Sequence, residues 1–253
     1  YRLKNPLTEV NIGLVGKYVE LKDAYKSISE AFIHAGAATQ CKVKIKWIHS
    51  EKLEDNPDCI QEELQGLNGI LVAPGFGSRG IEGKIMAVRY ARENKIPFLG
   101  ICLGMQCAVI EFARNVLGYK DAHSVEMSAS TTHPVIDIME EQKLIQNMGG
   151  TMRLGAYPCK LKENTKIYSA YQKENISERH RHRYEFNNAY LEAFEQAGMI
   201  ASGINPDTNL VEVVEIPSHP YFVGVQYHPE YRSTVVEPSP LFISFVKAAS
   251  RKE

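Results

Sequence analysis

Short apolar runs that end in glycine turns and lead into helical patterns constrain the fold of this chain more than any other feature. Such runs occupy residues 10–16, 69–73 and 97–101, and amphipathic patterns follow at residues 23–40, 81–94 and 105–117. A strand that is apolar at every position is buried on both faces, which is typical of parallel strands covered by helices. The alternation predicts an α/β fold, built from βαβ units into an open, largely parallel central sheet with helices on both faces.

The second half of the chain has a different pattern. Four more segments are typical of strands joined by short turns, at residues 153–161, 199–204, 210–216 and 221–227. Because short turns join antiparallel neighbours, we expect antiparallel additions to the same sheet.

Three other segments complete the expected organisation. Residues 43–47 alternate apolar side chains with lysines, which predicts a strand near a sheet edge. A closing helix is expected at about residues 240–249, and a loop at residues 140–148. We find no repeat and no linker, so a single domain is expected over residues 1–253.

Charge and cysteine content exclude several classes of function. Lys and Arg total 29 against 30 Asp and Glu, so the net charge of −1 does not favour nucleic acid as a partner. No apolar run approaches the ~20 residues that span a bilayer, and no signal peptide opens the chain, so we expect a cytoplasmic protein without a membrane partner. The five cysteines contain no C-x-x-C pair, which argues against disulfides and a metal site.

The strongest chemical motif is Gly100-Ile101-Cys102-Leu103-Gly104, between a buried strand and a helix. It has the G-x-C-x-G form of a nucleophile elbow, in which a strained turn exposes the nucleophile and the flanking glycines leave room for close backbone contacts. The N-terminus of the following helix would favour a thiolate. The pattern predicts a nucleophilic Cys102, and a buried structural cysteine is the alternative.

A cysteine nucleophile needs a base, and His228 is the best candidate. It follows an apolar strand and precedes Pro229 and Glu230. In an extended segment residues i and i+2 project to the same side, so Glu230 can orient the imidazole. His133 and His219 are also followed by proline but lack this acid, and we expect both in loops.

Gly75, Gly77 and Gly80 spell G-x-G-x-x-G after another buried strand. A dinucleotide site is one interpretation, but the next strand ends at the cysteine motif and offers no acid for a ribose. We prefer an oxyanion hole formed by the N–H groups of Gly75 and Leu103.

The densest basic run is Arg179-His180-Arg181-His182-Arg183. If it is extended, the arginines share one face and the histidines the other. A solvated face, an RNA contact and a metal site are alternatives. One arginine that binds a carboxylate is the simplest interpretation.

Together, the elbow cysteine, the later His-Pro-Glu and the earlier glycine turn resemble a class I glutamine amidotransferase domain. The strings Gly-Ile-Cys-Leu-Gly-Met-Gln, Gly-Gly-Thr-Met-Arg-Leu-Gly and Glu-Arg-His-Arg-His-Arg-Tyr-Glu are further similar to the CTP synthase family. The resemblance implies a Cys102, His228 and Glu230 triad that hydrolyses L-glutamine through a γ-glutamyl thioester. The ammonia would serve ATP-dependent amination of UTP.

The resemblance also implies the substrate contacts. Glutamine would meet Gly75, Leu103, Gly104, Met105, Gln106, Glu126 and Arg183. Glu126 suits its α-ammonium group and Arg183 its α-carboxylate. Proline at position 74, where many relatives have glycine, removes one N–H donor beside Gly75.

The chain begins at Tyr1, and the family implies an N-terminal synthase domain that is absent from it. ATP and Mg²⁺ would bind that domain, GTP would act as an allosteric effector associated with the region of Arg153, and the full enzyme would be a homo-oligomer. We expect no cofactor in the domain itself. The alternatives are a stand-alone γ-glutamyl hydrolase or cysteine peptidase, and an inactive glutamine-binding regulatory module.

Overall fold

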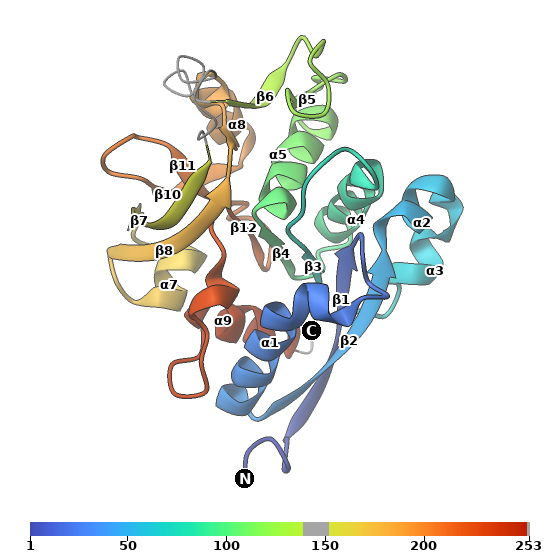
Figure 1. Ribbon diagram of the computed structural model, residues 1–253, viewed down its shortest axis with the longest axis vertical. Coiled ribbons are helices and arrows are strands. Elements are labelled where there is room, and N and C mark those ends of the chain that lie inside the picture. Colours follow the sequence, from blue (N-terminus) through green and yellow to red (C-terminus); the bar gives the residue numbers. More distant parts are fainter. Residues whose placement is uncertain (139–151, 252–253) are drawn as a thin grey trace.

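The computed structural model describes residues 1–138 and 152–251 (Figure 1). Within these residues, nine strands form one sheet in the order β2-β1-β3-β4-β12-β11-β10-β7-β8. The parallel half comprises β2 (Cys41–His49), β1 (Thr8–Gly16), β3 (Gly69–Val72), β4 (Phe98–Ile101) and β12 (Phe222–Val225). The antiparallel half comprises β11 (Val211–Glu215), β10 (Ile200–Ile204), β7 (Arg153–Leu161) and β8 (Asn175–His182). The expected sheet is confirmed, with antiparallel strands joined to a parallel half. One expectation was wrong: the segment at residues 221–227 was expected as an antiparallel addition, but β12 runs parallel to β4 and antiparallel to β11. It is buried at every position, as the other central parallel strands are, and so completes the parallel half.

Helices cover both faces of the sheet. Successive residues of β3 face opposite sides, so Ile70 packs into one hydrophobic core and Leu71 into the other. The Ile70 core also contains residues of α2 (Ser50–Asp55), α3 (Ile60–Leu64), α4 (Ile81–Glu93), α5 (Leu103–Asn115) and α8 (Leu191–Ala197). The Leu71 core contains residues of α1 (Lys26–Thr39), α7 (Lys166–Tyr171) and α9 (Pro240–Ala249).

The two edges of the large sheet differ in how far the sequence predicted them. β2 forms one edge, as its alternating lysines indicated. β8 forms the other edge and was not predicted as a strand, although its alternation is as expected, with Arg179 and Arg181 exposed and His180 and His182 buried.

Several smaller elements lie outside the large sheet and its covering helices. A second sheet contains β5 (His123–Ser124), β6 (Pro134–Ile138) and β9 (Tyr184–Phe186). The described ranges also contain four short 3-10 helices, η1 (Lys22–Tyr25), η2 (Pro57–Cys59), η3 (Asn188–Tyr190) and η4 (Pro229–Arg232). The loop expected at 140–148 lies outside the described residues. Among the residues that the structure describes, no helix is both long and apolar enough to cross a membrane.

Three neighbouring parallel strands in the middle of the sheet bring the candidate site residues together at their carboxyl ends. β4 lies between β3 and β12, with Val72 beside Gly100 and Ile101 beside Val225. Parallel strands that are in register end together, so the segments that follow all three strands meet there. These segments contain Gly75, Cys102 and His228.

Candidate active site

Cys102 lies on a sharp turn between β4 and α5. Its φ of 53° and ψ of −106° are a strained conformation for a residue with a side chain. The backbone N–H of Cys102 donates to the carbonyl of Val225 at 2.7 Å, which fixes the turn to β12. The side chain is 3% exposed and stands at the N-terminus of a helix of 13 residues. This is the local geometry that the elbow motif predicted.

The flanking glycines are required by close backbone contacts. A Cβ on Gly104 would lie 2.1 Å from the carbonyl oxygen of Val72, and one on Gly100 would lie 2.7 Å from the backbone of Gly104. Neither site has room for a side chain, because backbone atoms cannot withdraw as a flexible side chain can. The two glycines therefore let α5 start directly against the ends of β3 and β4.

His228 and Glu230 form a buried pair beside the cysteine. His228 Nδ1 donates to Glu230 Oε1 at 2.7 Å, and both side chains are at most 5% exposed. The backbone N–H of His228 donates to the carbonyl of Arg179 at 2.8 Å, so β8 holds the segment in place. Because Nδ1 is bonded to Glu230, Nε2 is the free nitrogen of the His228 ring.

The electrostatics of His228 favour its charged form. Burial alone would lower its pKa, but interactions with Cys102 and Glu230 outweigh burial and raise the pKa above its usual 6.5. Nε2 has no partner of ordinary hydrogen-bond geometry among the described residues, yet the cysteine is close enough to act on the ring. The arrangement therefore stabilises an imidazolium beside the sulfur of Cys102.

A cavity of about 200 Å³ opens over Cys102. It brings together several residues predicted from sequence, and its lining comprises Gly75, Phe76, Cys102, Gln106, Glu126, Met152, His182, Arg183 and Tyr184. The carboxylate of Glu126 accepts a hydrogen bond from the N–H of Gly77 at 3.3 Å. Arg183 is exposed in the turn between β8 and β9. The cavity therefore has one acidic and one basic side chain near the sulfur.

The remaining predicted contacts lie in the first turn of α5. Leu103, Gly104 and Met105 are buried and are not among the described residues that line this cavity. Leu103 Cδ2 lies 3.5 Å from where a Cβ on Gly75 would be, so the two predicted oxyanion residues are neighbours. Any contact of this turn with a ligand would come from the backbone.

Two lysines that sequence reasoning missed hold the segment around Gly75. Lys17 Nζ donates to the carbonyls of Phe76 and Gly77 at 2.6 and 2.8 Å, and Lys84 Nζ donates to the carbonyl of Ala73 at 2.7 Å. Burial lowers the pKa of Lys84 to about 8. The segment on both sides of Pro74 is thus fixed by cations, which adds positive potential next to Gly75. A lysine inside the apolar pattern of α4 was the signal that could have revealed this.

Cys102 also lines a second cavity, of about 350 Å³, which shares Gly75 and Phe76 with the first. Its lining includes His228, Arg181, Lys17 and Tyr231. Arg181 and Arg183 therefore lie in different cavities. Among the described residues, no group of three or more His, Cys, Asp or Glu side chains is placed to hold a metal ion.

A sheet with helices on both faces, and an elbow cysteine beside a His-Glu pair, are the features that the class I glutamine amidotransferase resemblance led us to expect. The sequence matches the family model "Glutamine amidotransferase class-I" over residues 20–248, so the chain belongs to the class I glutamine amidotransferases.

Within that class the chain is similar to CTP synthases. It is 66% identical over 249 residues to the CTP synthase of Cytophaga hutchinsonii, covering 98% of this chain and 46% of that protein. It is also 66% identical over 246 residues to the enzyme of Flavobacterium psychrophilum, covering 97% and 45%. The chain spans about half the length of the curated relatives it matches.

A solved structure has the same fold. The glutaminase domain of Trypanosoma brucei CTPS, with bound acivicin, superimposes with a TM-score of 0.91 at 41% identity, covering 96% of this chain and 95% of that one. The predicted fold class and the resemblance to a CTP synthase glutaminase domain are confirmed.

Proposed function

We propose that this chain hydrolyses L-glutamine as the ammonia-supplying domain of a CTP synthase. The observation that carries the proposal is the position of Cys102, strained at an elbow, beside the His228–Glu230 pair and open to a cavity with Glu126 and Arg183. Glutamine carries an α-ammonium and an α-carboxylate, and these two side chains have the matching charges.

The reaction follows from this arrangement in two stages. The Cys102 thiolate attacks the side-chain carbonyl carbon of glutamine, and N–H groups of Gly75 and Leu103 stabilise the resulting oxyanion. The C–N bond then breaks as His228 gives its proton to the departing ammonia, which leaves a γ-glutamyl thioester. A water molecule gives a proton to His228 and attacks the thioester, and glutamate and the thiolate are released.

The wider role rests on the relatives. The ammonia would aminate UTP to CTP in a synthase domain that also binds ATP and Mg²⁺, with GTP as an allosteric effector of a cytoplasmic homo-oligomer.

Trapping the thioester tests the proposed chemistry. The protein is quenched in acid during glutamine turnover, digested and examined by mass spectrometry. We expect a γ-glutamyl group on the peptide that contains Cys102 and on none of the peptides with the other four cysteines, all of which are buried. Turnover with the label on another residue, or with no acyl-enzyme at all, would contradict the mechanism.

Arg183→Lys tests the carboxylate contact. We expect the KM for glutamine to rise roughly tenfold, because lysine keeps the charge but loses the planar two-point fork, which is worth about one charge-assisted hydrogen bond. The matched control is Arg181→Lys, two residues away and also exposed. Arg181 lines the other cavity, and its guanidinium lies 5.9 Å from the centroid of the Phe76 ring. Equal effects of the two variants would indicate a general basic patch.

A further inference from the structure

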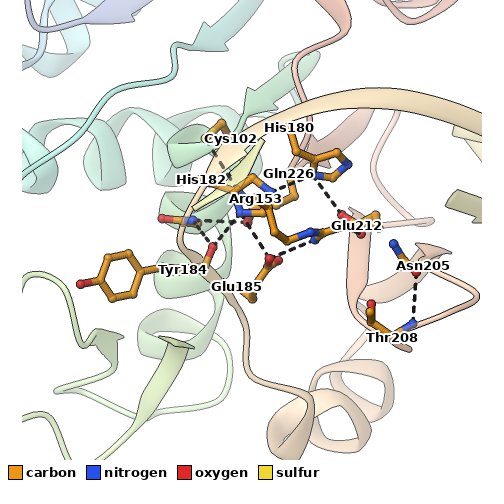
Figure 2. Close-up of polar contacts among 11 residues, drawn as sticks. Cys102, Arg153, His180, His182, Tyr184, Glu185, Asn205, Thr208, Glu212 and Gln226 are labelled. Atoms are coloured by element: carbon orange, nitrogen blue, oxygen red, sulfur yellow. Dashed lines mark hydrogen bonds and ion pairs between the residues drawn. The ribbon is translucent and has the colours of Figure 1, made fainter. Parts of the chain in front are cut away.

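Gln226 lies opposite the candidate nucleophile in a position that the proposed mechanism does not use. It is the residue after β12, and the register that pairs Val225 with Ile101 places it beside Cys102. Its side chain is fully buried, and Nε2 lies 3.8 Å from Cys102 Sγ (Figure 2). This distance is within hydrogen-bond reach of a sulfur acceptor, because sulfur is larger than oxygen.

The orientation of the Gln226 amide is fixed by its neighbours. Gln106 Nε2 lies 3.0 Å from the carbonyl oxygen of Tyr184, which can only accept. The same Nε2 lies 3.3 Å from Gln226 Oε1, so the oxygen of Gln226 accepts from Gln106. The amino group of Gln226 must then face the sulfur. A flipped amide would set two amino groups together and turn an oxygen toward a thiolate.

The Tyr184 carbonyl is itself held from its other side. His182 Nδ1 lies 3.3 Å from this oxygen and donates to it, which leaves His182 Nε2 to accept from His180 Nδ1 at 2.7 Å (Figure 2). Burial lowers the pKa of both histidines, so each ring is neutral and carries one N–H. Donation therefore runs in one direction, from His180 to His182 and from His182 to the Tyr184 carbonyl. The same carbonyl accepts from Gln106, which links it through Gln226 to the sulfur.

We propose that Gln226 is a positioning residue that donates a hydrogen bond to Cys102 Sγ, with its amide held in that orientation by Gln106 and the Tyr184 carbonyl. The hydrogen bond stabilises the thiolate and restrains the sulfur over the cavity. This inference rests on the proposed function, in which Cys102 is the nucleophile. It also gives Gln106 a second task besides contact with the substrate.

The test measures the rate of alkylation of Cys102 by iodoacetamide against pH, together with kcat and KM for glutamine. In Gln226→Leu we expect the midpoint of alkylation to move up by about one pH unit, since one hydrogen bond to the charged form is lost. We expect kcat to fall roughly tenfold and KM to stay within about twofold. The charged groups around the sulfur are unchanged in this variant, including His228, Lys84 and those lining the two cavities.

A second variant and a control keep the outcome clear. Gln226→Glu places a carboxylate against the sulfur, so we expect a larger upward shift than in Gln226→Leu. Gln196→Leu makes the same change at an exposed site on α8 and should behave as the wild type. Thermal unfolding identifies which variants fold. Either Gln226 variant that folds is enough to test whether Gln226 donates to the sulfur of Cys102.

The outcomes separate the two proposals. A wild-type protein that neither turns over glutamine nor alkylates at Cys102 would overturn the proposed function. A wild-type protein that does both, with a folded Gln226 variant that keeps the wild-type alkylation midpoint and kcat, would overturn only the role of Gln226.

Discussion

Replacing Cys102 by alanine is expected to abolish glutamate release, with a fall in kcat of at least about 10⁴-fold. The proposed reaction passes through a bond to this sulfur, and alanine offers no atom that can form it. Binding and oxyanion stabilisation without a nucleophile leave only a small residual rate. Glutamate release by the purified variant, measured over hours, provides the comparison.

The variant should also fold as the wild type does. Cys102 has a positive φ, and alanine has the same difficulty there as cysteine, so the substitution adds no new backbone strain. The control is Cys59→Ala, since Cys59 lies in η2, whose residues are not among those that line the cavity. Glutamate release by Cys102→Ala at the rate of Cys59→Ala would disprove the assignment of the nucleophile.

Two of the other cysteines, Cys107 and Cys159, cannot substitute for Cys102. Burial raises the pKa of Cys107 to about 12 and raises that of Cys159 as well, so neither ionises near neutral pH. All five cysteines are buried, but Cys102 lies beside a histidine whose pKa is raised by the contact. The environment of the sulfur, and not its burial, distinguishes the proposed nucleophile from the other cysteines.

Sequence patterns predicted the parts of the fold in which apolar side chains decide the structure. The central parallel strands β3, β4 and β12 are apolar at every position because both of their faces meet helices, and strands with one face in water do not have this pattern. The turn at Cys102 was predictable for a related reason, since glycines at 100 and 104 are needed only where backbones come very close.

The sequence did not predict β8, because its buried face is polar. Glu178, His180 and His182 alternate with exposed residues, and hydropathy ranks all of them as surface residues. Their burial is possible because each finds polar partners, for example the Tyr171 hydroxyl that donates to Glu178 at 2.9 Å. Such pairing depends on which strands become neighbours, which a local pattern cannot reveal.

Arg153→Met is expected to cause a large loss of stability. Arg153 Nη1 donates to Glu185 at 3.0 Å and Nη2 to Glu212 at 2.8 Å, and all three side chains are at most 8% exposed (Figure 2). Methionine preserves much of the packing but removes the cation. Two buried carboxyl groups then lack their partner, which costs about 3–5 kcal/mol when they are ionised.

The loss should depend on pH, and its sign follows from the glutamates. Burial raises the pKa of Glu185 to about 8 and raises that of Glu212, although Arg153 opposes both shifts. A carboxyl whose pKa is higher in the folded state binds more protons there than in the unfolded chain, so stability falls as pH rises through the folded pKa. In the wild type the fall in stability that Glu185 causes is complete above about pH 8. Without Arg153 the pKa values of Glu185 and Glu212 move higher, so the stability of the variant continues to fall above pH 8.

The unfolding temperature of Arg153→Met should therefore lie below that of the wild type at pH 6, with a gap that widens above about pH 8. Adding Glu185→Gln and Glu212→Gln to the variant removes the groups that titrate, and we expect the widening to disappear because neutral amides carry no charge to bury. Thermal unfolding of the three proteins between pH 6 and pH 9.5 measures this directly. A gap that stays constant over this range would mean that Arg153 stabilises the fold by packing over the Tyr157 ring, where its guanidinium lies 4.5 Å from the centroid, and not by compensating the two carboxylates.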